Sequence, residues 1–373
     1  MTLYPVAHPY ISSIPPYPPG RPIAAIAREF EFRPESIVKL ASNENPLGAS
    51  PAVVKALTEA VAQVNRYPDF DCFELYDALS RRLAIPAGQL ALGSGSSELL
   101  QVVVRAYVAP GDKVVMPQYS FISYESCARS VGAQAVVVPN RGWAPDLDGI
   151  LGAIDERVRV VFLATPNNPT GIAVPNAELE RFVDAMPPNV VLVLDEAYRD
   201  YLRPSERPAP ERLLAGRRNL LILRTFSKVY GLAGLRIGYG IGDSELIAIL
   251  RRLLPPFSVN ALGQVAAVAA LADDAFVTRS AALNAQERDR LMVAFDASGF
   301  EYVPSLGNFV LVRVGDGARA FDAMLKRGVI VRPVANYGLP AWLRVTVGLP
   351  GENDRFLEIL RELYPSGSRP RAS

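Results

Sequence analysis

Lys228 is placed where a lysine could act as an amine nucleophile. It follows the apolar run 220–223, comes directly after Ser227, and precedes a glycine-rich stretch that contains Arg236. An apolar environment disfavours the ammonium form, and the neutral amine is the form that attacks a carbonyl carbon. Arg236 could bind an anion beside it. A single lysine is more often a surface residue, so this pattern needs support from elsewhere in the chain.

Three other apolar runs also end in polar side chains. The sequence Gly-Ser-Gly-Ser-Ser at 93–97 opens a helical pattern and offers backbone amides and two hydroxyls to an anion. Asn168 lies in a turn with two prolines, and Asp195 follows five apolar residues. Helix capping, an Asx turn and a structural ion pair are the plainer explanations of these features taken singly. Four polar strand ends in one chain favour a shared binding site.

The apolar runs predict the elements that would position these groups. Residues 160–164, 190–194 and 220–223 read as strands buried on both faces, as in a parallel sheet. Helical stretches such as 176–186 lie between them, which predicts a doubly wound α/β domain. Ligands bind beyond the carboxyl ends of the strands in such a sheet. The polar residues after the runs should therefore meet at one edge.

Together the four groups would suit pyridoxal 5′-phosphate, which needs a phosphate grip, an acid for its pyridinium nitrogen, donors for its ring hydroxyl and a lysine for covalent attachment. The chain resembles the fold-type I aminotransferases of class I/II, and within them the histidinol-phosphate aminotransferases. The motifs that carry this resemblance cover nearly the whole chain in order: Pro-Tyr-Pro-Pro-Gly-Arg-Pro at 16–22, Leu-Ala-Ser-Asn-Glu-Asn-Pro-Leu-Gly at 40–48, Arg-Tyr-Pro-Asp at 66–69, Asn-Asn-Pro-Thr-Gly at 167–171, Asp-Glu-Ala-Tyr at 195–198, Ser-Lys at 227–228 and Leu-Arg-Val-Thr-Val-Gly at 343–348. Ser94 and Thr165 depart from it, because many relatives have asparagine there.

The resemblance implies a role for each cofactor-binding residue. Lys228 would hold the cofactor covalently and carry a proton between the substrate's α-carbon and the cofactor. Asp195 would pair with the pyridinium nitrogen, while Asn168 and Tyr198 would donate to the phenolic oxygen. Lys228, Asp195 and Tyr198 are then the catalytic residues, and the ring of Tyr119 would stack on the cofactor. The phosphate would be bound by Ser96, Ser97, Ser227 and Arg236, with Thr225 as a neighbour.

The resemblance also implies a substrate and an assembly. Arg332 and Arg344 would bind the substrate's anionic end, because an arginine fork suits phosphate and carboxylate alike. Tyr17 and Asn43 would be further substrate contacts, and Tyr67 would reach the phosphate in the other subunit's site of a homodimer. The implied reaction is transamination of L-histidinol phosphate with 2-oxoglutarate, which gives imidazole acetol phosphate and glutamate in histidine biosynthesis. An aromatic amino-acid aminotransferase on the same fold is the alternative.

Composition limits the other classes of function. The 373 residues carry 39 basic and 38 acidic side chains, a formal charge of +1, which argues against a nucleic-acid or polybasic membrane partner. Two cysteines and a single histidine, His8, argue against zinc and Ser-His-Asp chemistry, so we expect no metal site. No apolar stretch approaches the roughly 20 residues of a membrane span, and the first residues lack a signal-peptide pattern. A cytoplasmic enzyme with small-molecule partners, an amino donor and a 2-oxo acid, is expected.

The pattern along the chain predicts four segments. Residues 1–45 would form an arm on the small domain or the partner subunit, and residues 46–255 the large cofactor-binding domain with a mostly parallel sheet. Residues 256–365 would form a smaller α+β domain, and 366–373 a disordered tail. Ser50 and Pro51 predict the start of a helix, with the serine as its cap.

Overall fold

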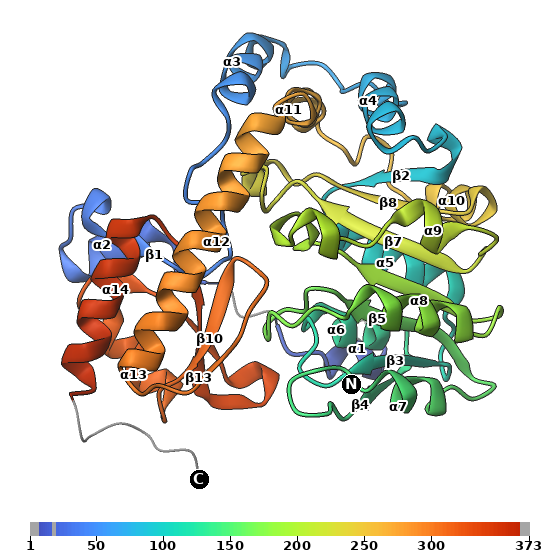
Figure 1. Ribbon diagram of the computed structural model, residues 1–373. Helices are drawn as coiled ribbons and strands as arrows, with labels where there is room; N and C mark the ends of the chain where they lie inside the picture. The colour runs from blue at the N-terminus through green and yellow to red at the C-terminus, as the bar shows by residue number, and fades with distance from the viewer. Residues whose placement is uncertain (1–6, 17–19, 366–373) are drawn as a thin grey trace, which may run out of the picture.

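The computed structural model describes residues 7–16 and 20–365 and shows two domains that lie side by side (Figure 1). The large domain is built on a seven-stranded sheet. In spatial order its strands are β2 (Leu90–Gly93), β8 (Gly238–Gly242), β7 (Leu220–Thr225), β6 (Val191–Asp195), β5 (Val158–Ala164), β3 (Lys113–Pro117) and β4 (Gln134–Val138). Only β8 runs antiparallel to its neighbours, so the mostly parallel sheet that we predicted is confirmed.

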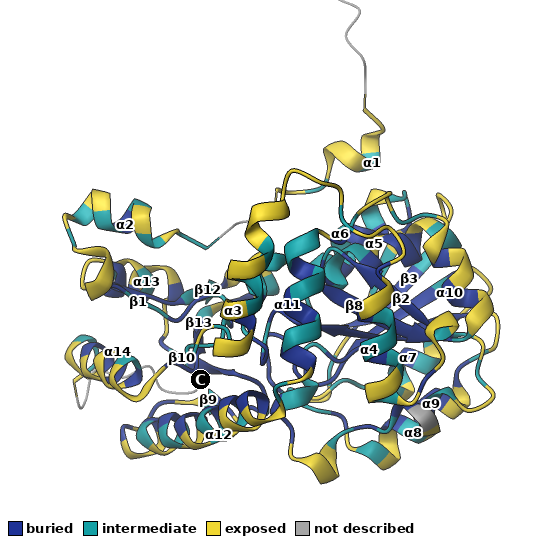
Figure 2. Ribbon diagram, turned by 90° about the horizontal axis from the view of Figure 1, so that it is seen from above, coloured by how far each residue is buried: buried dark blue, intermediate teal, exposed yellow. Residues whose placement is uncertain are grey.

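Helices cover both faces of this sheet, and each face has its own apolar core. One face is covered by α5 (Ser96–Tyr107), α6 (Ser123–Ser130) and α10 (Ser244–Arg251). The other is covered by α3 (Pro51–Ala60), α4 (Phe73–Leu83), α7 (Leu147–Gly152), α8 (Asn176–Ala185), α9 (Pro210–Leu214) and α11 (Ala261–Leu271). The central strands β6 and β7 are buried along their whole length, which explains why valine, leucine and isoleucine dominate their sequences. Figure 2 shows the sheet largely in the dark blue of buried residues.

The small domain contains two sheets. The four-stranded antiparallel sheet has the order β12 (Arg332–Val334), β13 (Leu339–Thr346), β10 (Phe309–Arg313) and β9 (Tyr302–Val303), and β1 (Val38–Lys39) pairs in parallel with β11 (Val329–Ile330). Its helices are α2 (Ile23–Phe30), α12 (Asp274–Ala297), α13 (Gly317–Leu325) and α14 (Pro350–Leu363). The short 3-10 turns of both domains are η1 (Pro34–Ser36), η2 (Val61–Gln63), η3 (Ala87–Gln89), η4 (Arg199–Tyr201), η5 (Pro204–Glu206), η6 (Ala233–Leu235) and η7 (Ala335–Tyr337).

The packing places one domain boundary differently from the position that we expected. We placed the start of the small domain at residue 256, but α11 lies against α3 and α4 and contributes Ala266 and Ala270 to the core of the large domain. The small domain therefore begins with α12, whose first turn still packs on the large domain through Val277. Alanine-rich sequence runs through both helices, so composition alone does not mark this boundary.

The N-terminal segment divides between the two domains. Helix α1 (Pro9–Ser12) packs on α6 of the large domain, whereas α2 packs on the small domain with Ile26 buried among its residues. Farther along, the Ser50 side chain accepts a hydrogen bond from the Val53 amide and Pro51 opens α3, which confirms the predicted cap. The predicted tail 366–373 lies outside the described residues.

Within the described ranges, no single helix has the length and apolar character of a membrane span. Helices α11 and α12 would pass such a test only if taken together, and they meet at an angle of 82°.

Candidate active site

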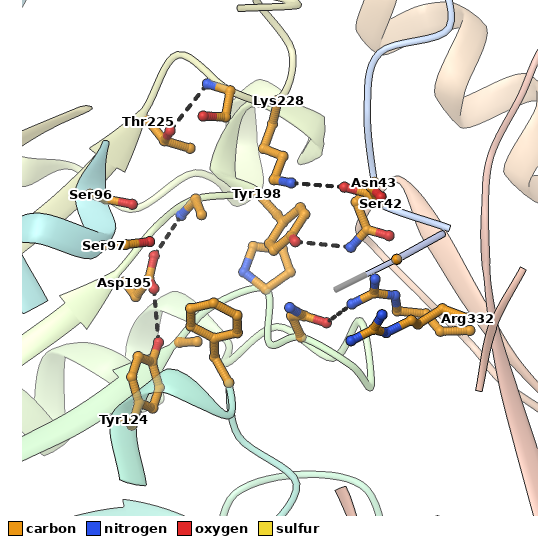
Figure 3. A pocket seen from close by; sticks show the side chains of 18 of the residues that line it. Ser42, Asn43, Ser96, Ser97, Tyr124, Asp195, Tyr198, Thr225, Lys228 and Arg332 are labelled. Carbon is orange, nitrogen blue, oxygen red and sulfur yellow. Dashed lines mark hydrogen bonds between the residues drawn. The ribbon is translucent and has the colours of Figure 1, made fainter. Parts of the chain in front are cut away.

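A pocket lies where the carboxyl ends of β5, β6 and β7 face the small domain (Figure 3). Most of the predicted site residues line it, although they come from distant parts of the chain. The large domain contributes Ser96, Ser97, Asn168, Asp195, Tyr198, Thr225, Ser227, Lys228 and Arg236, and the remaining predicted residues are Asn43, Arg332 and Arg344.

The Lys228 side chain lies beside groups from both domains. Its Nζ donates a hydrogen bond to the Ser42 carbonyl at 3.3 Å and lies 5.5 Å from the centroid of the Tyr198 ring. Burial, followed by the positive charge of Arg344, lowers the pKa of Lys228 to about 7. A large fraction of this amine is therefore neutral near pH 7, as a nucleophile or general base requires.

Asp195 ends β6 inside the pocket and is held by two donors. The Tyr124 hydroxyl donates to Asp195 Oδ2 at 2.9 Å, and the Ala197 amide donates to Oδ1 at 3.1 Å. Burial raises the pKa of Asp195, against the effect of these hydrogen bonds. A carboxylate in such a place is stabilised by a bound cation, so Asp195 is suited to pair with a protonated ring nitrogen.

Groups that can bind an anion lie at the first turn of α5. Ser96 and Ser97 begin this helix after Gly95, and Arg236 donates from Nη1 to the Ser227 hydroxyl at 3.3 Å beside it. A Cβ atom on Gly95 would come within 2.5 Å of Arg236, and one on Gly238 within 2.2 Å of the Ser96 nitrogen. The absence of these side chains lets the arginine and β8 approach the helix terminus. Hydroxyls, helix amides and a guanidinium together make a strong site for a phosphate.

Two arginines of the small domain line the opposite part of the pocket. Arg344 on β13 is paired in register with Arg332 on β12. Its Nη1 donates to Asn168 Oδ1 at 2.5 Å, and its Nη2 donates to the Ala41 carbonyl at 2.9 Å. The guanidinium of Arg344 also lies 5.5 Å from the centroid of the Phe309 ring. These contacts fix the orientation of Arg344 at a site where two positive charges can bind one anion.

Two of the three remaining predicted site residues, Tyr119 and Tyr67, are not among those that line this pocket. The Tyr119 ring lies against Trp143, at 5.6 Å between centroids, and the pocket wall contains Phe121 in its place. Tyr119 has a φ of 54°, so the chain turns sharply there and directs the next aromatic residue to the pocket. Tyr67, which we expected in the other subunit's site, does not line this pocket; its ring stacks on Phe257 with 4.7 Å between centroids, and the residue is 83% exposed. Tyr17 lies outside the described residues.

Sequence reasoning missed several lining residues. Phe121, Tyr124 and Tyr337 line the pocket, and Tyr124 also holds Asp195. Tyr124 belongs to α6, whose helical pattern gives no signal of a polar contact with β6. The Tyr124 ring stacks on Phe162 of β5, with 4.6 Å between ring centroids, and this position depends on tertiary packing alone.

Comparisons with known proteins agree with this geometry. The model of the family "Aminotransferase class I and II" matches residues 35–360. The chain is 50% identical to histidinol-phosphate aminotransferase 1 of Cupriavidus pinatubonensis over 94% of both chains, and 50% identical to histidinol-phosphate aminotransferase 1 of Thiobacillus denitrificans over 96% of this chain and 93% of that one.

Among solved structures, the histidinol-phosphate aminotransferase of Sinorhizobium meliloti, in complex with pyridoxal-5′-phosphate, superimposes with a TM-score of 0.87 and 30% identity. The match covers 97% of this chain and 99% of that one. Because the family model spans most of the chain and the relatives align over nearly their full length, the chain belongs to the class I and II aminotransferase family.

Proposed function

We propose that the protein is a pyridoxal-phosphate-dependent transaminase that converts L-histidinol phosphate and 2-oxoglutarate into imidazole acetol phosphate and glutamate, a step of histidine biosynthesis. The observation that carries this proposal is the arrangement of one amine, one buried carboxylate and two separate anion sites around a single pocket. The names of the relatives at 50% identity support the choice of substrate.

The donor set of the pocket fits pyridoxal phosphate. The first turn of α5 with Ser227 and Arg236 would bind its phosphate, Asp195 its ring nitrogen and Lys228 its aldehyde carbon. Because Gly95 and Gly238 carry no side chains, Arg236 and β8 lie close to the first turn of α5, and the hydroxyls, helix amides and guanidinium gather at one place, as a tightly held phosphate requires. When bound, the cofactor supplies an electron sink for the charge left when the substrate loses its α-proton.

The side chains of this protein would perform the remaining work. Asp195 would keep the ring nitrogen protonated, because a buried carboxylate strongly favours a positive neighbour. Asn168 and Tyr198 would hold the phenolic oxygen. Lys228, as a neutral amine, would accept the proton from the substrate's α-carbon, a task suited to an amine with a pKa of about 7.

Arg332 and Arg344 would bind the anionic end of each substrate in turn. Histidinol phosphate presents a phosphate, whereas glutamate presents carboxylates, and a pair of guanidinium groups can bind either. Arg344 donates from its terminal nitrogens to Asn168 and the Ala41 carbonyl, and it lines the pocket in register with Arg332. Two guanidinium groups on neighbouring strands of one pocket wall support the assignment of an anion site.

We also propose a homodimer in which Tyr67 completes the partner's site. The support is a set of apolar side chains on α3, η2, the following loop and the start of α4 that are between 53% and 83% exposed: Val54, Val61, Val64, Tyr67, Phe70 and Phe73. Clustered exposed apolar side chains of this kind usually mark an interface between proteins. A cytoplasmic location stays a prediction.

A comparison of amino donors tests the proposed substrate. The purified holoenzyme is given histidinol phosphate, phenylalanine or tyrosine, each with 2-oxoglutarate, and kcat/KM is measured for each donor. We expect histidinol phosphate to be used at least about 100-fold better, because a phosphate engages both arginines with more charge than a carboxylate does. A higher kcat/KM for phenylalanine or tyrosine would instead establish the aromatic aminotransferase.

A further inference from the structure

Asn43 lies between the small domain and the hydroxyl of Tyr198 (Figure 3). Its Nδ2 donates a hydrogen bond to the Tyr198 oxygen at 2.9 Å, and only 1% of the residue is exposed. We expected this side chain to bind substrate. The structure shows its amide engaged with protein groups on both sides.

Thr346 on β13 fixes the direction of that amide. The Asn43 backbone amide donates to Thr346 Oγ1 at 2.9 Å, and Thr346 Oγ1 donates its hydrogen to Asn43 Oδ1 at 3.1 Å. Asn308 also donates to the Asn43 carbonyl at 3.0 Å. A hydroxyl has one hydrogen, so a threonine that accepts from the backbone and donates to Oδ1 leaves Nδ2 facing Tyr198.

This arrangement determines the direction and the strength of the hydrogen bond that the Tyr198 hydroxyl donates. An oxygen that accepts a hydrogen bond from Asn43 points its own hydrogen away from Asn43. Accepting one bond also strengthens the bond that the same hydroxyl donates, because consecutive hydrogen bonds polarise one another. The Tyr198 ring is itself held edge-to-face against Phe309, with 5.1 Å between centroids, so the hydroxyl has little freedom to move.

We propose that Asn43 is a positioning residue for Tyr198: it directs the tyrosine's hydrogen toward the phenolic oxygen of bound pyridoxal phosphate and makes that hydrogen a stronger donor. The inference rests on the proposed cofactor. It gives Asn43 a function without substrate contact, which differs from the one we expected from the sequence. Burial raises the pKa of Tyr198 to about 12, while the positive charge of Arg344 and the Asn43 hydrogen bond act in the opposite direction, in keeping with a polarised hydroxyl.

The test removes the Asn43 side chain and follows the absorption of the cofactor bound to Lys228 as a function of pH. Asn43 has a φ of 53°, a conformation that glycine adopts readily, so Asn43→Gly removes the amide without backbone strain. A weaker donor at Tyr198 leaves more negative charge on the phenolic oxygen, and the lysine-linked nitrogen then keeps its proton to higher pH. We expect the midpoint of the titration to rise by about 0.5 to 1 pH unit, the effect of one lost hydrogen bond.

Variants of Thr346 and Tyr198 separate positioning from general damage. Thr346→Val removes the hydroxyl and should raise the midpoint as Asn43→Gly does, whereas Thr346→Ser keeps the hydroxyl and should restore the wild-type value. Tyr198→Phe should raise the midpoint by itself. Adding Asn43→Gly to Tyr198→Phe should then change it no further, because Asn43 acts through the tyrosine's hydroxyl.

An equal shift from Asn43→Gly with or without the Tyr198 hydroxyl would overturn the proposal, as would no shift in either background. These outcomes can be distinguished from a failure of the proposed function. If the protein does not use pyridoxal phosphate, the wild-type protein itself will show no cofactor absorption band that titrates with pH, and both proposals will be refuted.

Discussion

Replacing Arg344 is expected to weaken both half-reactions while leaving cofactor binding intact. Arg344→Ala removes a guanidinium that touches Asn168 and the Ala41 carbonyl and faces the proposed anion site. Loss of one buried contact between a charged donor and an anion costs about 2–4 kcal/mol, or roughly 30- to 1,000-fold in kcat/KM. Arg344→Lys keeps the charge, but one ammonium group cannot replace a planar fork, so its loss should fall toward the lower end.

The assay measures kcat/KM separately for histidinol phosphate and for glutamate, together with the absorption spectrum of the bound cofactor. Arg313→Lys is a matched control, because Arg313 lies on β10 of the same sheet in an ion pair with Glu301 at 2.9 Å and does not line the pocket. It should change kcat/KM less than about twofold. If Arg344→Ala impairs neither substrate, or if it abolishes cofactor binding, the assignment of Arg344 to the substrate's anion is wrong.

Three further predictions follow from the same geometry. Asp195→Asn should leave thermal stability nearly unchanged, since the asparagine oxygen can accept from the Ala197 amide while its Nδ2 donates to the Tyr124 oxygen. It should lower kcat by about 30-fold or more because the ring nitrogen loses its counter-ion, and wild-type kcat in this variant would refute the pairing. In the folded protein the pKa of Lys228 is about 7, whereas its usual value, taken for the unfolded chain, is 10.5. Between these pH values the unfolded chain binds a proton at Lys228 that the folded protein has released. The free energy of unfolding of the cofactor-free protein should therefore rise from pH 7 to pH 9. Lys228→Met should flatten that rise in urea denaturation at the two pH values, and identical slopes would contradict the lowered pKa. Mixing Tyr67→Phe and Lys228→Ala subunits should restore about a quarter of wild-type activity, because half of the dimers are mixed and each has one intact site; no recovery would place Tyr67 outside the partner's site.

The parallel strands and the polar residues at their ends could be predicted from the sequence because both depend on local patterns. Apolar runs mark β6 and β7; Asp195 is the last residue of β6, and Lys228 lies three residues after the end of β7. The carboxyl ends of parallel strands meet at one edge, so the large-domain part of the pocket follows without knowledge of long-range packing.

Contacts between residues far apart in the sequence could not be predicted in this way. The hydrogen bond from Asn43 to Tyr198 joins residues 155 positions apart, and that from Thr346 to Asn43 joins residues 303 positions apart. The position of Phe121 in place of Tyr119 depends on one backbone turn with positive φ at a residue other than glycine. The boundary between the two domains could not be predicted from the sequence either, because an alanine-rich helix can pack on either domain.

Peptide mapping after borohydride reduction tests the central assignment most directly. The holoenzyme is reduced, digested and analysed by mass spectrometry for the peptide that carries the reduced pyridoxyl group. We predict a single modified residue, Lys228, whose amine lies in the pocket with its pKa lowered to about 7. Modification at Lys39 or Lys113 instead, or no modified lysine in protein that contains the cofactor, would contradict the account of this site.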